Sequence, residues 1–166
     1  MSIRRQSLLV LVGVCVAGLG WIHAQQAGTA GPLSPQDFLE IEQLVQSYTR
    51  DIDIGPNDPS WVFAHDGVFV RPNGAEVRGA KALKEFYANV RKNHDANRPK
   101  ERHVLSNLVI RATREGAEGS VYVTTLDSGS SSAVAIRWYG MYADTFVKTP
   151  AGWRIQRRVD THVVSE

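Results

Sequence analysis

The stretch from Lys100 to Val164 most constrains the fold, because it holds four strand-like segments in succession with no helical pattern between them. Each segment is rich in alternating apolar and β-branched residues, and short turn sequences separate the segments. Strands that follow one another through short turns pair in an antiparallel manner. The segments are residues 100–110, 119–126, 133–148 and 152–164. This order predicts a sheet with four successive antiparallel strands.

The third segment is long, and we expect it to bend. Gly140 lies near its middle, and a glycine inside a strand often marks a bulge or a tight bend. We therefore predict that the sheet is strongly curved.

A helix is predicted to begin after Ser34 and to run to about Ile54. Ser34 is a favourable N-cap, Pro35 suits the first helical position, and Asp37 complements the positive end of the helix dipole. Apolar residues then recur every three or four positions, which gives the helix one apolar face. They are Phe38, Ile41, Leu44, Val45, Tyr48 and Ile52.

The region between this helix and the strands is expected to form a short helix, a hairpin and a third helix. The predicted ranges are residues 57–63 for the short helix, 67–70 and 76–78 for the hairpin strands, and 79–93 for the third helix. Helices that precede a run of strands are typical of α+β domains. We predict three N-terminal helices packed on a strongly curved, mainly antiparallel sheet that forms a cone-shaped barrel.

Residues 1–24 resemble a secretory signal peptide. Arg4 and Arg5 precede an apolar run from Leu8 to Gly20, and Ala24 provides a cleavage site. The expected organisation is a signal peptide over residues 1–24, a flexible linker over 25–33 and one domain over 34–166, with a periplasmic or secreted location. Retention of the segment as an N-terminal anchor is the alternative.

The charge balance gives no indication of a nucleic-acid partner. The chain has a formal net charge of +2, and residues 1–24 hold two arginines and no acidic residue, so the predicted mature chain is neutral. The single cysteine, Cys15, lies in the predicted signal peptide. Neither a disulfide nor a thiol nucleophile is therefore expected after cleavage, and no membrane association is expected.

One face of the segment 100–110 has the composition of a pocket lining. With a period of two, His103, Leu105, Asn107 and Val109 share a face, which places a histidine and an amide among aliphatic side chains. A histidine has an ordinary pKa of about 6.5 and exchanges protons near neutral pH. As a general base it would accelerate a reaction by on the order of 100- to 10,000-fold. A buried histidine that only stabilises the sheet is the alternative interpretation.

A set of short motifs extends from Ser34 to Val164. The motifs are Tyr48 with Asp53 at the end of the first helix, FAHD around Asp66, Gly79 before the third helix, RHVLSN around His103, GMYAD from Gly140 to Asp144, and GWRI from Gly152 with Arg158. In order and spacing they resemble the SnoaL-like branch of the nuclear-transport-factor-2-like superfamily. That superfamily includes dehydratases, isomerases, polyketide cyclases, dehydrohalogenases and members with no known catalysis.

Within this superfamily, Tyr48, Asp53 and His103 resemble the aromatic, carboxylate and histidine residues of scytalone dehydratase and bile-acid 7α-dehydratase. The resemblance implies an enzyme that needs neither metal nor cofactor and uses a His–Asp acid/base pair beside a carbonyl group. The substrate would be a small, largely apolar molecule, and the reaction a dehydration or an isomerisation. A non-catalytic module for small-molecule binding or dimerisation is the alternative function.

Two aspartates compete for the role of partner to His103. Asp51 lies nearer the apolar face on an ideal helical wheel, but the helix ends at this point and the wheel need not apply. The spacing in the resembled family favours Asp53. Asp51 is the second choice, and an exposed aspartate at a helix end is the alternative interpretation of Asp53.

Further residues are candidates for contact with a substrate. Tyr48 would donate a hydrogen bond to a substrate oxygen, and Asn107 would either polarise a carbonyl or brace the backbone. Aromatic residues would form the wall of the pocket, although each also suits an ordinary core. They are Trp61, Phe69, Phe86, Tyr122, Trp138 and Tyr142.

The remaining polar residues indicate structure more than chemistry. Asp144 and Arg158 are expected to pair across the last two strands. His65, His94 and His162 show no metal-ligand spacing with one another or with His103, so no metal site is expected, and no glycine-rich nucleotide motif is present. The alternating pattern of the last three strands also leaves an outer sheet face that would suit a homodimer.

Overall fold

The computed structural model describes residues 31–97, 101–127 and 133–165 and is organised around a six-stranded sheet. The strands are β1 (Phe63–Val70), β2 (Glu76–Arg78), β3 (Arg102–Ala112), β4 (Ala117–Asp127), β5 (Ala135–Thr149) and β6 (Gly152–Ser165). Their order across the sheet is β2-β1-β6-β5-β4-β3. The predicted signal peptide, residues 1–24, lies outside the described residues.

Strand pairing confirms the four successive antiparallel strands expected from the sequence. β3 pairs with β4, β4 with β5 and β5 with β6, all antiparallel, whereas β1 pairs with β6 in parallel. The sheet curls but does not close, so the expected cone-shaped barrel is wrong. Closure would require the two edge strands, β2 and β3, to pair with each other. β2 has only three residues, and β1 and β2 form a short hairpin at the far side of β6.

The structure contains two α-helices, and the prediction of three is wrong. They are α1 (Pro35–Asp53) and α2 (Ala80–Asn97). The predicted middle helix is a single 3-10 turn, η1 (Pro59–Val62), because Phe63 already adopts an extended backbone and begins β1. The predicted start of the first helix is confirmed, since the Ser34 and Asp37 side chains form a reciprocal capping box.

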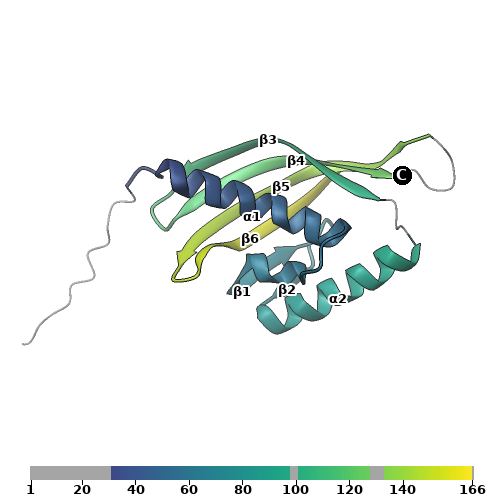
Figure 1. Cartoon of the computed structure of the whole chain (residues 1–166), viewed down its shortest axis with the longest axis horizontal. Coiled ribbons are helices and arrows are strands. Elements are labelled where there is room, and N and C mark those ends of the chain that lie inside the picture. The colour runs from purple at the N-terminus through teal and green to yellow at the C-terminus, as the bar shows by residue number, and fades with distance from the viewer. Residues whose placement is uncertain (1–30, 98–100, 128–132, 166) are drawn as a thin grey trace, which may run out of the picture.

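Helix α1 lies across one face of the sheet, and α2 lies beside β1 and β2 (Figure 1). The apolar stripe of α1 faces the sheet and is buried there, apart from Phe38 at its first turn. The core cluster joins this stripe to aromatic residues of β1, α2, β5 and β6. The polar residues at the last turn of α1 are therefore held over the end of β3, which α1 contacts.

Gly140 occupies a bulge of β5, as the sequence indicated. The pairing of β5 with β6 shifts register between Tyr139 and Gly140. A Cβ atom at Gly140 would lie 2.1 Å from the carbonyl oxygen of Thr161, so only glycine permits this close approach of the two strands. Bulges increase local twist, and this one turns the end of β5 that carries Trp138.

In the described part of the chain, neither helix is both long and apolar enough to span a membrane.

Candidate active site

His103 and Asp53 form a buried pair between β3 and the C-terminal end of α1. The Nδ1 atom of His103 lies 2.6 Å from Oδ1 of Asp53, and the backbone N–H of His103 donates to Oδ2 of Asp53 at 2.7 Å. The side chains are 8% and 7% exposed, respectively. Because both carboxylate oxygens are engaged by the same residue, the imidazole is fixed in position and orientation. With Nδ1 directed to Asp53, Nε2 is the nitrogen left to exchange a proton with another molecule.

A cavity of about 190 Å³ borders this pair. Six residues predicted from the sequence line it: Tyr48, Phe69, Phe86, His103, Trp138 and Tyr142. Cavities for drug-sized ligands measure roughly 300–1,000 Å³, so this one suits a smaller molecule. Most of the surface of the cavity is apolar, and its wall also carries several polar and charged side chains.

Asp51, the second candidate for the histidine partner, is engaged elsewhere. Its Oδ2 accepts a hydrogen bond of 2.7 Å from the indole N–H of Trp61, and its Oδ1 accepts one of 3.4 Å from the Asn57 amide. Asp51 therefore joins the end of α1 to η1. Trp61 stands in this contact and does not line the cavity, where the sequence analysis expected it.

Asn107 does not share a face with His103, because β3 contains a bulge. Its φ angle is 55°, in the left-handed region, and the pairing with β4 shifts register between Ser106 and Val109. After the bulge, Leu108 and Ile110 pack against the core, whereas Asn107 and Val109 are exposed. The expectation of one continuous face is wrong for these two residues. Asparagine tolerates positive φ better than most residues, which is the signal that the sequence offered.

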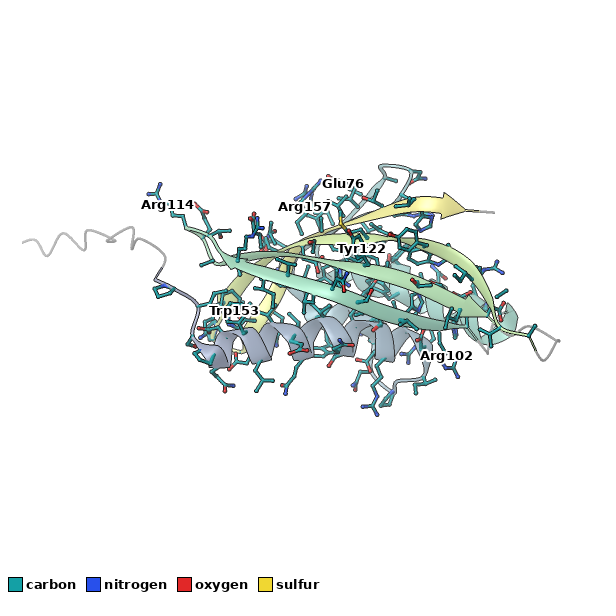
Figure 2. All side chains as sticks on the ribbon, turned by 90° about the horizontal axis from the view of Figure 1, so that it is seen from above. Glu76, Arg102, Arg114, Tyr122, Trp153 and Arg157 are labelled. Carbon is teal, nitrogen blue, oxygen red and sulfur yellow. The ribbon has the colours of Figure 1, made fainter. Side chains whose placement is uncertain are left out.

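Tyr122 also lies outside the cavity. Its side chain is exposed and contacts the ring of Tyr139, with the ring centroids 6.2 Å apart. On β4 it alternates with the buried Val121 and Val123, so it projects from the opposite face of the sheet. Figure 2 shows Tyr122 on the side of the sheet away from α1.

Tyr48 presents a neutral hydroxyl to the cavity. Burial raises the pKa of Tyr48 above its ordinary value, while the Arg158 charge acts in the opposite direction. The hydroxyl of Tyr87 donates to that of Tyr48 at 3.2 Å. Because Tyr48 accepts this hydrogen bond, its own proton is available to a group in the cavity.

The predicted pair of Asp144 and Arg158 is present beneath the cavity. Arg158 donates from Nε and from a terminal nitrogen to the two oxygens of Asp144, at 2.8 and 2.6 Å. The guanidinium lies 4.2 Å from the ring centre of Tyr48 and 4.4 Å from that of Tyr142. Burial alone would lower the pKa of Arg158, but the Asp144 carboxylate outweighs burial and raises it. Arg158 therefore remains charged and is a structural residue.

Asp160 and His162 also line the cavity, and the sequence analysis did not select them. The ring of His162 stacks on Trp138 with the centroids 4.3 Å apart, and Trp138 contacts the ring of His103 edge-on at 6.0 Å. Residues 158, 160 and 162 share one face of β6. Because side chains two residues apart on a strand share a face, the expected pairing of Arg158 with Asp144 was the signal that could have pointed to Asp160 and His162.

A second hollow, of about 410 Å³, lies on the sheet face away from α1. It is lined by Val109, Ser120, Ala143, Thr145, Arg157 and Val159, among others. Figure 2 shows Arg157 on this side. This hollow is larger, but neither His103 nor Asp53 lines it, so the smaller cavity is the candidate active site.

Within residues 31–97, 101–127 and 133–165, no three histidine, cysteine, aspartate or glutamate side chains are grouped so as to hold a metal ion.

Comparisons with known proteins agree with this architecture. A family model of the SnoaL-like domain matches residues 35–159. The uncharacterised protein Rv2910c of Mycobacterium tuberculosis is 32% identical over 129 residues, which are 75% of this chain and 84% of that protein.

Solved structures show the same fold. An NTF2-like protein of Novosphingobium aromaticivorans has 21% identity and a TM-score of 0.68 over 79% of this chain and 84% of its own. A scytalone-dehydratase-like protein of the same organism has 20% identity and a TM-score of 0.64, over 78% of this chain and 85% of its own. By its matching family model and its curated relative, the chain belongs to the SnoaL-like family.

Proposed function

We propose that the protein is a lyase or isomerase that moves a proton beside the carbonyl group of a small, largely apolar molecule. His103 acts as the base, Asp53 orients its ring, and Tyr48 donates a hydrogen bond to the carbonyl oxygen. One observation carries the proposal: the imidazole that Asp53 holds at 2.6 Å also lines a cavity. A histidine with only a structural role has no need of a cavity beside it.

The chemistry follows from the positions of these groups. Nε2 of His103 takes a proton from the carbon next to the carbonyl, and negative charge develops on the carbonyl oxygen. The Asp53 carboxylate stabilises the imidazolium that forms, as in other His–carboxylate pairs. The neutral hydroxyl of Tyr48 stabilises the oxygen, and such a hydrogen bond is strong in a cavity with little water. The intermediate then either expels its β-hydroxyl group as water, with a proton taken from an acidic group of the site, or regains the proton from His103 at another carbon.

The apolar walls support the choice of substrate class. Phe69 and Phe86 contact each other with ring centroids 5.4 Å apart, and Trp138 provides a third aromatic surface. Such surfaces favour one or two hydrocarbon rings over sugars or nucleotides.

Turnover of simple ketones tests the proposal. We suggest incubating the wild-type protein in D₂O with 3-hydroxycyclohexanone and 3-hydroxy-1-tetralone for dehydration, and with 3-cyclohexenone for isomerisation, and following the reactions by proton NMR. His103→Gln should lower kcat/KM by on the order of 100- to 10,000-fold. His65→Gln, at an exposed position of β1, is the matched control and should have no effect.

Binding separates the enzyme from the alternative function. Calorimetric titration with 1-tetralone should show that His103→Gln still binds a ketone. Binding of 1-tetralone to the wild-type protein without conversion of any of the three substrates would contradict the enzyme and favour a small-molecule-binding module.

A further inference from the structure

Asp160 is a buried carboxyl group at the cavity that the proposed mechanism leaves without a role. It lies on β6 opposite Tyr142 of β5, and its side chain is 10% exposed. It lines the same cavity as His103. Among the described residues, its Oδ1 has no hydrogen-bond partner. A buried carboxyl oxygen without a partner is costly, and its persistence at a cavity indicates that a ligand completes it.

The neighbouring basic groups do not neutralise Asp160. Arg158, two residues before it, directs its two hydrogen bonds to Asp144. Nε2 of His162 lies 3.7 Å from Oδ1 of Asp160, which is beyond hydrogen-bond distance. The wall of the cavity also carries Tyr48 from α1, Arg71 after β1, His94 from α2, Glu101 before β3, His103 from β3 and Tyr142 from β5.

The ring contacts place two histidine–carboxylate pairs along one wall. Asp53 and His103 form the first pair, at the β3 edge. The indole of Trp138 touches the ring of His103 on one side and stacks on that of His162 on the other. His162 is partly exposed and lies beside Asp160. A molecule resting against Trp138 would therefore have a titratable group at each end.

We propose that Asp160 is a second proton-transfer residue of this site, which donates a proton to a leaving hydroxyl group while His103 removes the carbon-bound proton. His162 connects Asp160 with solvent. The inference rests on the proposed function and narrows it to the dehydration of β-hydroxy carbonyl compounds. Burial raises the pKa of Asp160 to about 6, with the charges of His162, Arg158 and His103 acting against burial, so a neutral carboxyl is present in mildly acidic solution.

The step balances without any further reactant. His103 takes the proton from the α-carbon, and the C–H electron pair becomes the new C=C bond. The C–O electron pair at the β-carbon stays with the oxygen, which takes the Asp160 proton and leaves as water. His103 then carries one extra proton and Asp160 lacks one, and transfer between them through solvent and His162 restores both.

A change of leaving group tests this role. Fluoride leaves without being protonated, so 3-fluorocyclohexanone does not need the acid, whereas 3-hydroxycyclohexanone does. Asp160→Asn should lower kcat/KM for the hydroxy ketone by on the order of 100-fold and leave that for the fluoro ketone nearly unchanged. His103→Gln should lower both. Asp66→Asn, at an exposed position of β1, is the matched control and should lower neither.

The outcomes separate this inference from the proposed function. Equal losses for the two ketones in Asp160→Asn, or no loss, would overturn the second proton-transfer residue and leave the role of His103 intact. No conversion of either ketone by the wild-type protein would overturn this inference, and the proposed function would fall with it only if 3-cyclohexenone were left unconverted as well. Thermal unfolding of Asp160→Asn, which replaces a carboxyl by an amide of the same shape, shows that the variant is folded.

Discussion

The protein contains two buried pairs of an acidic and a basic side chain near the cavity, and we assign them different roles. Asp144 and Arg158 are joined by two hydrogen bonds, and their side chains are 1% and 0% exposed. Asp53 and His103 are almost as buried, yet the histidine borders a cavity. Burial and short distances therefore do not distinguish a structural pair from the pair that we propose to be catalytic.

The two pairs differ in whether the basic group can be reached from the cavity and in whether it can release its proton. Arginine cannot release its proton under ordinary conditions, and the rings of Tyr48 and Tyr142 both lie against the guanidinium. Histidine changes its charge near neutral pH, and Nε2 of His103 is not used by Asp53. The first pair stabilises the curved sheet, whereas the second pair is able to exchange a proton with a bound molecule.

The largest expected effect on stability comes from breaking the structural pair. Asp144→Asn leaves the buried Arg158 charge uncompensated and should lower the free energy of unfolding by about 3–5 kcal/mol. Denaturant unfolding measures this loss, with Asp66→Asn as the exposed control. A loss below about 1 kcal/mol would show that the arginine finds another partner, and the contrast between the pairs would fail.

Asp160 should make stability depend on pH in the direction opposite to an ordinary ion-paired carboxylate. Its pKa is about 6 in the folded protein and about 3.9 when unfolded, so the unfolded chain loses this proton first as pH rises. The stabilising contribution of Asp160 to the free energy of unfolding is fully present below about pH 4 and is lost by about pH 6. It amounts to at most about 3 kcal/mol.

Unfolding of the wild type and of Asp160→Asn at a series of pH values isolates this contribution. The variant should gain stability relative to the wild type between about pH 4 and 6. A constant difference across this range would contradict a buried, protonated carboxyl.

The two aspartates at the end of α1 allow a matched pair of substitutions, one at the histidine partner Asp53 and one at Asp51. Asp53→Asn weakens a charged hydrogen bond worth about 1.5–3 kcal/mol and should lower kcat/KM by roughly 10- to 100-fold. Asp51→Asn, two residues away, weakens the contacts with Trp61 and Asn57 and should affect stability but not activity. Equal activity losses in the two variants would show that the whole helix end matters and not the Asp53 carboxylate.

The smallest expected effect comes from Tyr87, which donates a hydrogen bond to Tyr48. Tyr87→Phe removes the donor to the Tyr48 hydroxyl and should cost about 1 kcal/mol of stability. Activity should fall less than tenfold, because Tyr48 itself remains. Steady-state kinetics and thermal unfolding of the variant check both expectations, and a complete loss of activity would place Tyr87 in the reaction.

Local signals in the sequence predicted most of the fold. The capping residues of α1, the turn of the β1–β2 hairpin and the four C-terminal strands are encoded by neighbouring residues, and all are confirmed. Closure of the sheet and the length of η1 depend on how distant segments meet, and those two expectations are wrong.

For the candidate site too, predictions based on local spacing held only where no distant segment intervened. The alternation of β3 correctly placed His103 toward the interior, but one residue with positive φ, Asn107, reversed the faces beyond it. The helical wheel placed Asp51 nearer than Asp53 to the apolar face, and Asp51 is indeed buried, but its carboxylate accepts a hydrogen bond from Trp61 and does not contact His103. Such contacts between distant segments are not encoded by local spacing. The pairing of Asp53 with His103 came from the family resemblance.

The most direct test of the central claim is a nitrogen-15 NMR measurement of the His103 ring, with and without 1-tetralone. We expect that, when the ring is neutral, Nδ1 carries the proton and Nε2 does not, and that the ketone shifts the Nε2 signal. His103→Gln assigns the signals. A proton on Nε2 of the neutral ring, together with no response to the ketone, would contradict the account, because His103 would then be a structural residue like Arg158.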